Sequence, residues 1–247
     1  ILATAAVMTT FLAHRVLVRL ELREITARPV FAGEDARFRV YVHNPEPRNR
    51  FSIRACSEQG HDSIDLPALK TRALILTQAT ETRGWLAMEP FRLESRFPLG
   101  LFRAWAWWFP TERCLVWPRP AENPPPLPRD GEDASGREQR GEGEELHSLR
   151  EYRAGDSPRH IAWKTSARQD ALYTREMATP RSEACELDWY RLNEQDPEKR
   201  LSILTAWVLE ADRRGIRYRL RLPSAVTERT HGTRHRERCL RMLALAP

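Results

Sequence analysis

Three side chains that could form a hydrolytic triad lie close together in the middle of the chain. Asp156, His160 and Ser166 fall within eleven residues, but no serine here has the glycine-flanked turn that exposes a nucleophile beside oxyanion donors. His160 stands four residues after Asp156, the spacing of neighbours on one helix face, so a charge contact at a helix end is the simpler interpretation. A hydrolase or transferase that uses Asp156 and His160 is the enzymatic alternative.

No motif indicates phosphate or metal binding. Gly141 and Gly143 lack the lysine and the helix start of a phosphate loop, and acidic residues flank them. His231 and His235 have the spacing of one helical face, but no adjacent glutamate or third ligand accompanies them. The four cysteines lie far apart, which favours buried, reduced side chains over a zinc or redox site. We therefore predict no cofactor and no metal.

A turn followed by a helix is expected to position the segment around Asp156. Residues 149–153 look extended, Gly155 begins a turn, and Pro158 suits the first helical position after a capping Asp156 or Ser157. The arginines of this segment could clamp an anion, but nearby acids can pair with them. We predict a structural brace, with Trp163 as its buried anchor.

Residues 22–118 alternate between apolar and polar side chains. Phe38, Val40 and Val42 alternate with polar neighbours, and Phe51, Ile53 and Ala55 continue the pattern after a turn-rich segment. Further strands are expected over 73–77, 85–96, 101–109 and 113–117. Short alternating strands between turns predict an antiparallel, immunoglobulin-like β-sandwich.

Aromatic residues are concentrated near residue 105. We expect Trp105 and Trp107 to fill the core from one face of a strand and Trp108 to be the more exposed. A binding platform, such as a membrane interface, is the other interpretation.

The C-terminal part changes to a helical and strand pattern. Strands are expected over 170–177 and 184–192. Asp196 and Pro197 should begin a long helix that ends at Gly215. The helix has an apolar stripe, and in the strand after it apolar residues alternate with arginines. A basic helix should follow over 233–246. This order predicts a small α/β module with parallel strands. The residues expected in these cores are Leu201, Leu204, Val208, Ala211, Ile216, Tyr218, Leu220, Leu222, Cys239, Leu240, Leu243 and Leu245.

The N-terminal segment is apolar and is followed by basic residues. Residues 1–13 would reach roughly 20 Å as a helix, short of the ~30 Å hydrocarbon core, and the chain begins with Ile1, which predicts a fragment or a processed form. Arg15, Arg19 and Arg23 follow, as expected on a cytoplasmic face. We predict a partial transmembrane helix over 1–20, a β-sandwich over 21–118, a Pro-rich and acidic linker over 119–146 and an α/β domain over 147–247.

The stretch from Tyr152 to Arg168 resembles the signature of the bacterial "domain of unknown function 58" family, and residues 91–105 look like its second hallmark. The matching signature positions are Tyr152, Arg153, Gly155, Asp156, Pro158, Arg159, Ile161, Trp163, Lys164, Ser166, Ala167 and Arg168. The resemblance implies N-terminal membrane helices, a β-sandwich and a region related to von Willebrand factor type A domains. It also implies, as partners, MoxR-type AAA+ ATPases or transglutaminase-like membrane proteins.

One departure from type A domains concerns the metal. The Asp-x-Ser-x-Ser motif that holds Mg²⁺ in such domains is replaced here by Asp188-Trp-Tyr-Arg-Leu192. Arg191 would repel a divalent cation and is expected to pair with Asp188. We therefore predict a degenerate site without metal.

Taken together, these features predict a non-catalytic scaffold or adaptor at the bacterial inner membrane, with its soluble body facing the cytoplasm and a protein as its partner. The chain carries 40 Lys and Arg against 34 Asp and Glu. These basic residues are dispersed along the chain, which argues against nucleic acid as the partner. A nucleic-acid-binding module built on Arg217, Arg219 and Arg221 is the remaining alternative.

Overall fold

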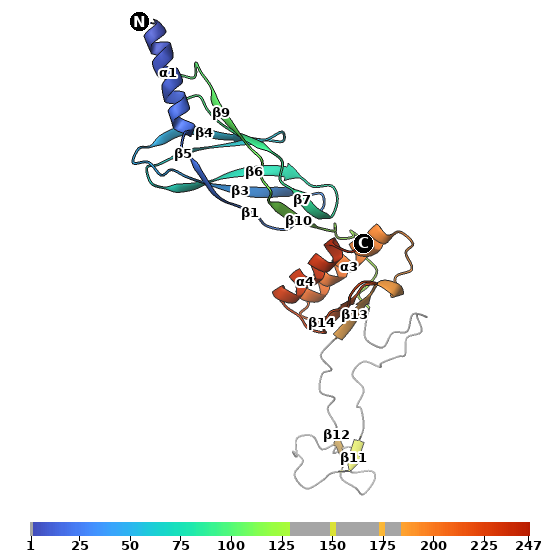
Figure 1. The fold of residues 1–247 in the computed structure, drawn as a ribbon. Coiled ribbons are helices and arrows are strands. Elements are labelled where there is room, and N and C mark those ends of the chain that lie inside the picture. The colour runs from blue at the N-terminus through green and yellow to red at the C-terminus, as the bar shows by residue number, and fades with distance from the viewer. Residues whose placement is uncertain (1, 129–148, 152–172, 176–183) are drawn as a thin grey trace. The chain divides into compact units, whose positions relative to one another are not determined.

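The computed structural model describes residues 2–128, 149–151, 173–175 and 184–247, and within them it is a mixed α/β structure with several sheets (Figure 1). The chain forms two compact units. Unit 1 contains residues 1–124, 194–206 and 237–247, and unit 2 contains residues 125–193 and 207–236. The division at residues 118 and 146 expected from the sequence stays a prediction.

Helix α1 (Leu2–Leu17) opens unit 1. Thr9, Ala13 and Val16 recur at helical spacing and form its buried stripe. The turn after the helix places Arg19 in the left-handed region, with φ of 60°, a common way for a helix to end. Within the described residues, no helix combines the length and the apolar character needed to cross a membrane.

The first sheet of unit 1 joins β1 (Glu21–Ala27), β3 (Asp35–His43) and β6 (Thr71–Ala79), all antiparallel. The alternation expected on β3 is confirmed, since Phe38, Val40 and Val42 are buried, whereas Arg37 and Arg39 are exposed and Tyr41 is half-buried. One face of β3 therefore contributes to the core, as a period of two requires.

The second sheet has the order β5–β4–β8–β9 and is also antiparallel. Its strands are β4 (Arg50–Cys56), β5 (His61–Leu66), β8 (Phe91–Ser95) and β9 (Ala104–Trp108). A register shift between Arg50 and Ile53 accompanies a positive φ of 54° at Ser52. Because this irregularity breaks the alternation, Arg50 is buried and Phe51 is exposed, so the prediction that Phe51 shares the core face was wrong.

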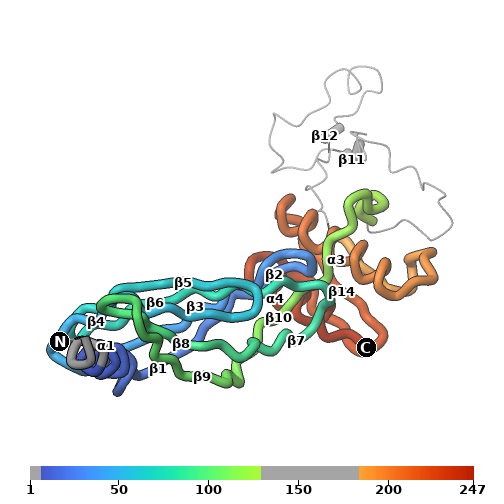
Figure 2. The backbone as a smooth tube through the Cα atoms, turned by 90° about the horizontal axis from the view of Figure 1, so that it is seen from above, coloured from blue at the N-terminus to red at the C-terminus, as the bar shows by residue number. Residues whose placement is uncertain are grey.

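A third sheet joins β2 (Val30–Phe31), β10 (Arg113–Trp117) and β7 (Gly84–Ala87). The strand expected over 113–117 is confirmed, whereas the one expected over 85–96 is divided between β7 and β8. Side chains from β3, β4, β6, β8 and β10 meet in one apolar core. The smooth trace in Figure 2 shows the strands running alongside one another, with α1 at their end.

Unit 2 contains the predicted parallel strands. β13 (Ala184–Asp188) pairs in parallel with β14 (Arg217–Arg221), and a 3-10 turn, η2 (Trp189–Arg191), follows β13. Tyr218 and Leu220 are buried on β14, as the alternation predicted. A separate antiparallel pair joins β11 (Leu149–Glu151) to β12 (Tyr173–Arg175).

Helices α3 (Pro197–Arg213) and α4 (Thr233–Ala244) complete the described chain. The predicted start of α3 is confirmed, since Asp196 Oδ1 accepts a hydrogen bond from the backbone N–H of Glu198 at 2.9 Å. Gly215 follows the helix with φ of 68°. The apolar stripe of α3 is fully buried, as are Cys239, Leu240 and Leu243 of α4, but Leu245 lies beyond the end of α4 and is exposed.

Candidate functional site

The family signature lies outside the described residues. Of the region around it, the structure describes only β11 and β12. The predicted brace, its Trp163 anchor and the enzymatic pair Asp156 and His160 therefore stay predictions.

Asp188 is a cap of η2 and a partner of β14. Its Oδ1 accepts a hydrogen bond from the backbone N–H of Tyr190 at 3.0 Å, and its Oδ2 lies 3.6 Å from Nη1 of Arg221. The ion pair predicted with Arg191 is instead made by Arg221, because the parallel register sets residues 188 and 221 side by side. Asp188 is buried, and Arg191 follows it in an exposed position. These residues do not fit Mg²⁺, which prefers several oxygen ligands.

Removal of the Asp188 side chain should destabilise unit 2. Asp188→Ala leaves the η2 amide without its cap and Arg221 without its carboxylate, at an expected cost of about 1–2 kcal/mol in the free energy of unfolding. Urea unfolding followed by circular dichroism measures this, with Glu228→Ala, which removes an exposed carboxylate of unit 2, as the control. A midpoint equal to that of the control would show that the cap is dispensable.

The two spaced histidines do not share a helical face. α4 begins at Thr233, so His231 lies before the helix and is exposed. His235 is buried, its ring lies tilted against that of Tyr218 with the centroids 4.5 Å apart, and a ring nitrogen is 3.1 Å from the Tyr218 carbonyl oxygen. His235 is therefore used in packing. No group of three or more His, Cys, Asp and Glu within the described ranges could hold a metal ion.

The arginines of β14 are largely engaged inside unit 2. Arg219 Nη2 donates to Glu186 Oε1 at 2.8 Å, and Arg221 pairs with Asp188 and lies over the Tyr190 ring, 5.7 Å from its centroid. Two of the three cations proposed for nucleic acid thus already have acidic partners.

The end of α1 is held by a buried arginine. Arg50 is 2% exposed, and its Nη1 donates to the carbonyl oxygens of Val16 and Val18 at 2.6 Å each. Its Nε donates to Asn44 Oδ1 at 2.8 Å. Carbonyls at a helix C-terminus lack partners within the helix and carry partial negative charge, so a guanidinium suits this position.

A carboxylate balances this cation. Arg50 Nη2 lies 3.5 Å from Glu46 Oε2. Burial lowers the pKa of the Arg50 guanidinium, and Glu46 opposes that shift. Asn44 is itself buried and donates to the carbonyl oxygens of Arg48 and Pro67 at 2.7 and 3.1 Å. α1 is thus fixed to the turn before β4 by a connected polar network.

A second charged cluster occupies the outer face of the β4–β8–β9 sheet. Glu94 of β8 is 3% exposed, and its Oε2 lies 3.1 Å from Nη2 of Arg92 and 3.8 Å from Nη1 of Arg103. Its Oε1 lies 3.9 Å from Nη1 of Arg54. Three guanidinium groups around one carboxylate leave two net positive charges.

Two tryptophans extend this cluster along β9. The antiparallel register pairs Glu94 with Trp105 and Arg92 with Trp107, so these side chains share the outer face. The Arg92 and Arg103 guanidinium carbons lie 5.8 and 5.1 Å from the ring centroids of Trp107 and Trp105, respectively. We call this set the arginine–tryptophan face; its members are Arg54, Arg92, Glu94, Arg103, Trp105 and Trp107.

The exposure of these tryptophans overturns the sequence prediction. Trp105 and Trp107 are 55% and 54% exposed, and Trp108 is the least exposed of the three at 42%. The β8–β9 register places Trp105 and Trp107 opposite Glu94 and Arg92, whereas Trp108 lies opposite the buried Phe91.

The sequence analysis also missed Arg50 and Glu94. Arg50 is a charged residue beside the turn after His43, which was one signal of a special role. Its inward position, however, depends on the irregular backbone at Ser52. Glu94 stands within a run of apolar and basic residues, where a lone acid could have been marked as an ion-pair partner.

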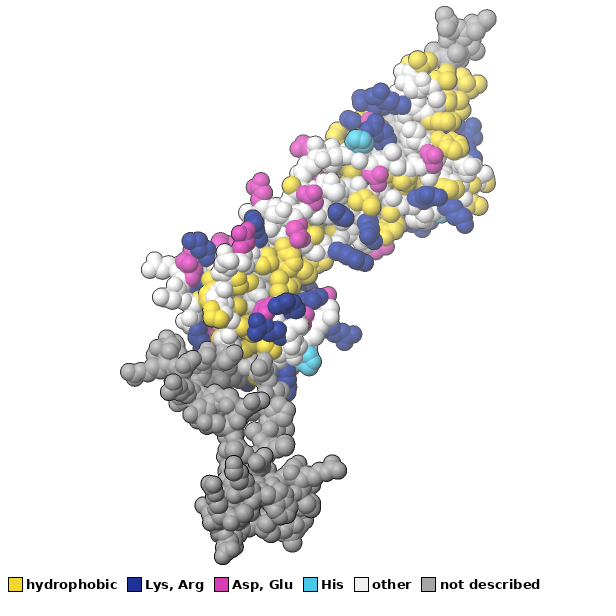
Figure 3. Space-filling view, turned by 180° about the vertical axis from the view of Figure 1, so that it is seen from behind, with side chains coloured by type: hydrophobic (Ala, Val, Ile, Leu, Met, Phe, Trp, Pro, Cys, Tyr) yellow, Lys and Arg dark blue, Asp and Glu magenta, His cyan; other side chains and the backbone are white. Residues whose placement is uncertain are grey.

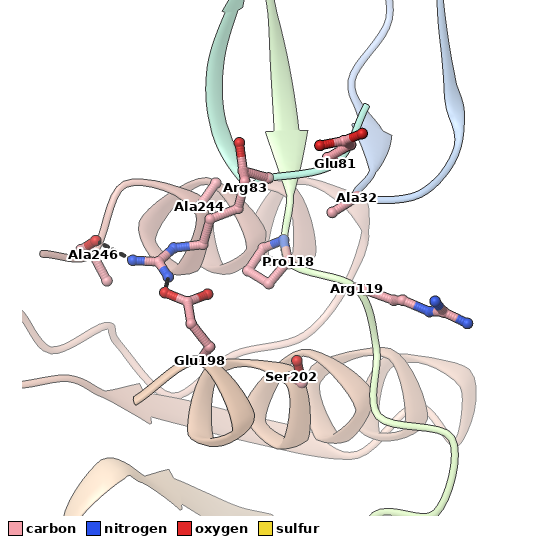
Figure 4. Close-up of a pocket in the computed structure, with 10 residues that line it drawn as sticks. Ala32, Glu81, Arg83, Pro118, Arg119, Glu198, Ser202, Ala244 and Ala246 are labelled. Carbon is pink, nitrogen blue, oxygen red and sulfur yellow. Dashed lines mark hydrogen bonds and ion pairs between the residues drawn. The ribbon is translucent and has the colours of Figure 1, made fainter. Parts of the chain in front are cut away.

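Unit 1 also contains a hollow of about 640 Å³ (Figure 4). Arg83 reaches into it, pairs with Glu198 and donates from Nη2 to the Ala246 carbonyl oxygen at 2.8 Å. Its charge is therefore used to join segments of unit 1, which makes this hollow a weaker candidate for ligand binding.

These observations define a mixed α/β protein with a fixed N-terminal helix and an exposed aromatic face. A model of the family described as "Protein of unknown function DUF58" matches residues 148–188, and this match supports the DUF58 family for the chain. A comparison with curated proteins found no match.

Proposed function

We propose that this protein is a non-catalytic scaffold that is attached to a membrane through α1 and binds other proteins through its folded body. The observation that carries the proposal is that α1 is apolar on two sides. One side packs on the sheets, and on the other side Val7, Met8 and Phe11 are 71%, 58% and 57% exposed. A helix that is apolar around its circumference is typical of a buried or membrane environment.

The Arg50 network gives this attachment a mechanical consequence. A helix held only by apolar contacts could move on the body, whereas Arg50 joins the last turn of α1 to the β4 strand through directed hydrogen bonds. The body of unit 1 would then take a defined orientation at the bilayer. Arg15, Arg19 and Arg23 lie near this end and suit the charged cytoplasmic side of an inner membrane.

The finer parts of the proposal concern fold and partners. We propose that the sheets of unit 1 are an immunoglobulin-like sandwich and that unit 2 is a reduced von Willebrand A-like module, because its strands β13 and β14 pair in parallel and helix α3 lies between them in the chain. The use of Asp188 as a cap and ion-pair partner suits protein binding without a metal. By family resemblance, the proposed partner is a MoxR-type AAA+ ATPase or a transglutaminase-like membrane protein.

Membrane attachment is tested with lipid vesicles. Val7→Asn combined with Phe11→Asn should lower partition into phosphatidylglycerol-containing vesicles at least about a hundred-fold, since two large apolar contacts are lost. Flotation measures bound and unbound protein. Leu69→Asn combined with Ile75→Asn removes exposed apolar side chains outside α1 and should leave partition unchanged. Wild-type protein that stays at the bottom of the gradient would refute the attachment.

Partner binding needs a separate experiment. Affinity capture from membranes should recover the same AAA+ ATPase with wild type and with a control variant, in which only exposed arginines other than Arg191 are changed. Arg191→Ala, which changes an exposed residue and leaves the Asp188 cap in place, should reduce its recovery if unit 2 contributes to the interface. The capture is also run with the ATPase as bait. If neither protein recovers the other, the proposed partner is contradicted.

The nucleic-acid alternative has its own measurement. A module that binds phosphates through β14 should lose affinity steeply as salt rises. Fluorescence anisotropy with labelled DNA and RNA between 50 and roughly 200 mM salt would reveal this slope, and a flat response removes the alternative.

A further inference from the structure

The end of unit 1 that carries α1 exposes a second apolar surface. The loop between β8 and β9 presents Leu99, Leu101 and Phe102, which are 65%, 68% and 38% exposed. The loop is closed by a hydrogen bond from the Gly100 N–H to the Arg96 carbonyl oxygen at 2.8 Å. β9 continues the surface with Trp105 and Trp107, and Phe109, directly after the strand, is 73% exposed.

This surface is next to the membrane-attachment helix. α1 contacts β4, β8 and β9, and the loop before β9 runs beside α1 in both ribbon and tube views (Figures 1 and 2). The space-filling view shows hydrophobic side chains gathered at this end, with Lys and Arg among them (Figure 3).

The chemistry of the surface favours one occupant. Tryptophan combines an apolar ring with one N–H donor and is enriched at the boundary between lipid tails and water. The arginine–tryptophan face adds two net positive charges beside these rings, from Arg54, Arg92 and Arg103 against Glu94. A surface that joins aromatic rings, aliphatic loop residues and excess cation matches the headgroup layer of an anionic bilayer.

We propose that the β8–β9 loop and the arginine–tryptophan face insert into the headgroup region of an anionic membrane, as a second contact beside α1. This inference rests on the proposed attachment through α1 and adds the orientation of unit 1. α1 provides one contact, and the tryptophans of β9 provide another, so the outer face of the β4–β8–β9 sheet turns towards the lipid.

Quenching by brominated lipid tests the location of the rings. In full-length protein bound to brominated phosphatidylglycerol vesicles, part of the tryptophan emission should be quenched. Trp105→Phe combined with Trp107→Phe should remove most of that quenching, whereas Trp85→Phe changes a tryptophan of β7 that is 48% exposed and should leave it intact. Bound protein whose quenching is equal in wild type and in the double variant would overturn this inference while leaving the α1 attachment in place.

Affinity gives a second readout. Trp105→Ala combined with Trp107→Ala should weaken partition roughly ten-fold or more, since each ring loses apolar contact with the lipid, with Trp85→Ala as the control. Wild type should also bind phosphatidylglycerol vesicles more tightly than phosphatidylcholine vesicles, by about five-fold for each arginine engaged. If the double variant binds both vesicles as wild type does, the rings do not contribute to lipid binding and the inference fails. If wild type binds neither, the proposed attachment fails with it.

Discussion

Arg50→Met should destabilise unit 1 by about 3–5 kcal/mol. Methionine keeps the apolar stem of the side chain, but it leaves the carbonyl oxygens of Val16 and Val18 without the guanidinium donor. It also removes one of the two N–H groups that donate to Asn44 Oδ1, the other being the Glu46 backbone N–H. Each buried acceptor that loses its partner costs about 1–3 kcal/mol, and the loss of one member of a buried ionic network is of the same order. Urea unfolding followed by circular dichroism measures the free energy of unfolding.

Two further variants make this result specific. Arg48→Met removes a neighbouring, partly exposed cation that also pairs with Glu46, and it should cost less than about 1 kcal/mol. Arg50→Lys keeps the charge but lacks the planar fork that serves several acceptors together, so an intermediate loss is expected. If Arg50→Met unfolds at the midpoint of Arg48→Met, the network does not hold α1.

The second large effect is expected for Glu94→Gln. Glutamine has nearly the same shape, so the change isolates the charge that balances Arg54, Arg92 and Arg103. We expect a loss of about 2–3 kcal/mol, less than for a fully buried pair, because these arginines are 28–39% exposed and water can solvate them. Chemical unfolding again measures it.

The same variant should alter the tryptophan environment. Arg92 and Arg103 lie between Glu94 and the rings of Trp107 and Trp105, so loss of the carboxylate should change the tryptophan emission of the folded protein. Glu122→Gln removes an exposed carboxylate paired with Arg119 and should change stability by less than about 0.5 kcal/mol. A folded Glu94→Gln protein as stable as this control would show that the carboxylate does not organise the face.

Much of the local structure could be predicted from the chain. The alternation on β3 and β14 identified their buried faces, because side chains on a strand point to opposite sides in turn. The cap at Asp196 and the glycine at position 215 located both ends of α3, because capping chemistry acts within a few residues. The mid-chain signature indicated the family whose model matches residues 148–188.

The candidate site could not be predicted in the same way. The inward position of Arg50 depends on an irregular backbone at Ser52, and the outward position of Trp105 and Trp107 depends on which residues of β8 lie opposite β9. A shift of one residue in a strand register reverses the face of every side chain on that strand. Local sequence thus determined which segments become strands and helices. Pairing between segments distant in the chain determined which charges are buried and which aromatic rings reach the surface.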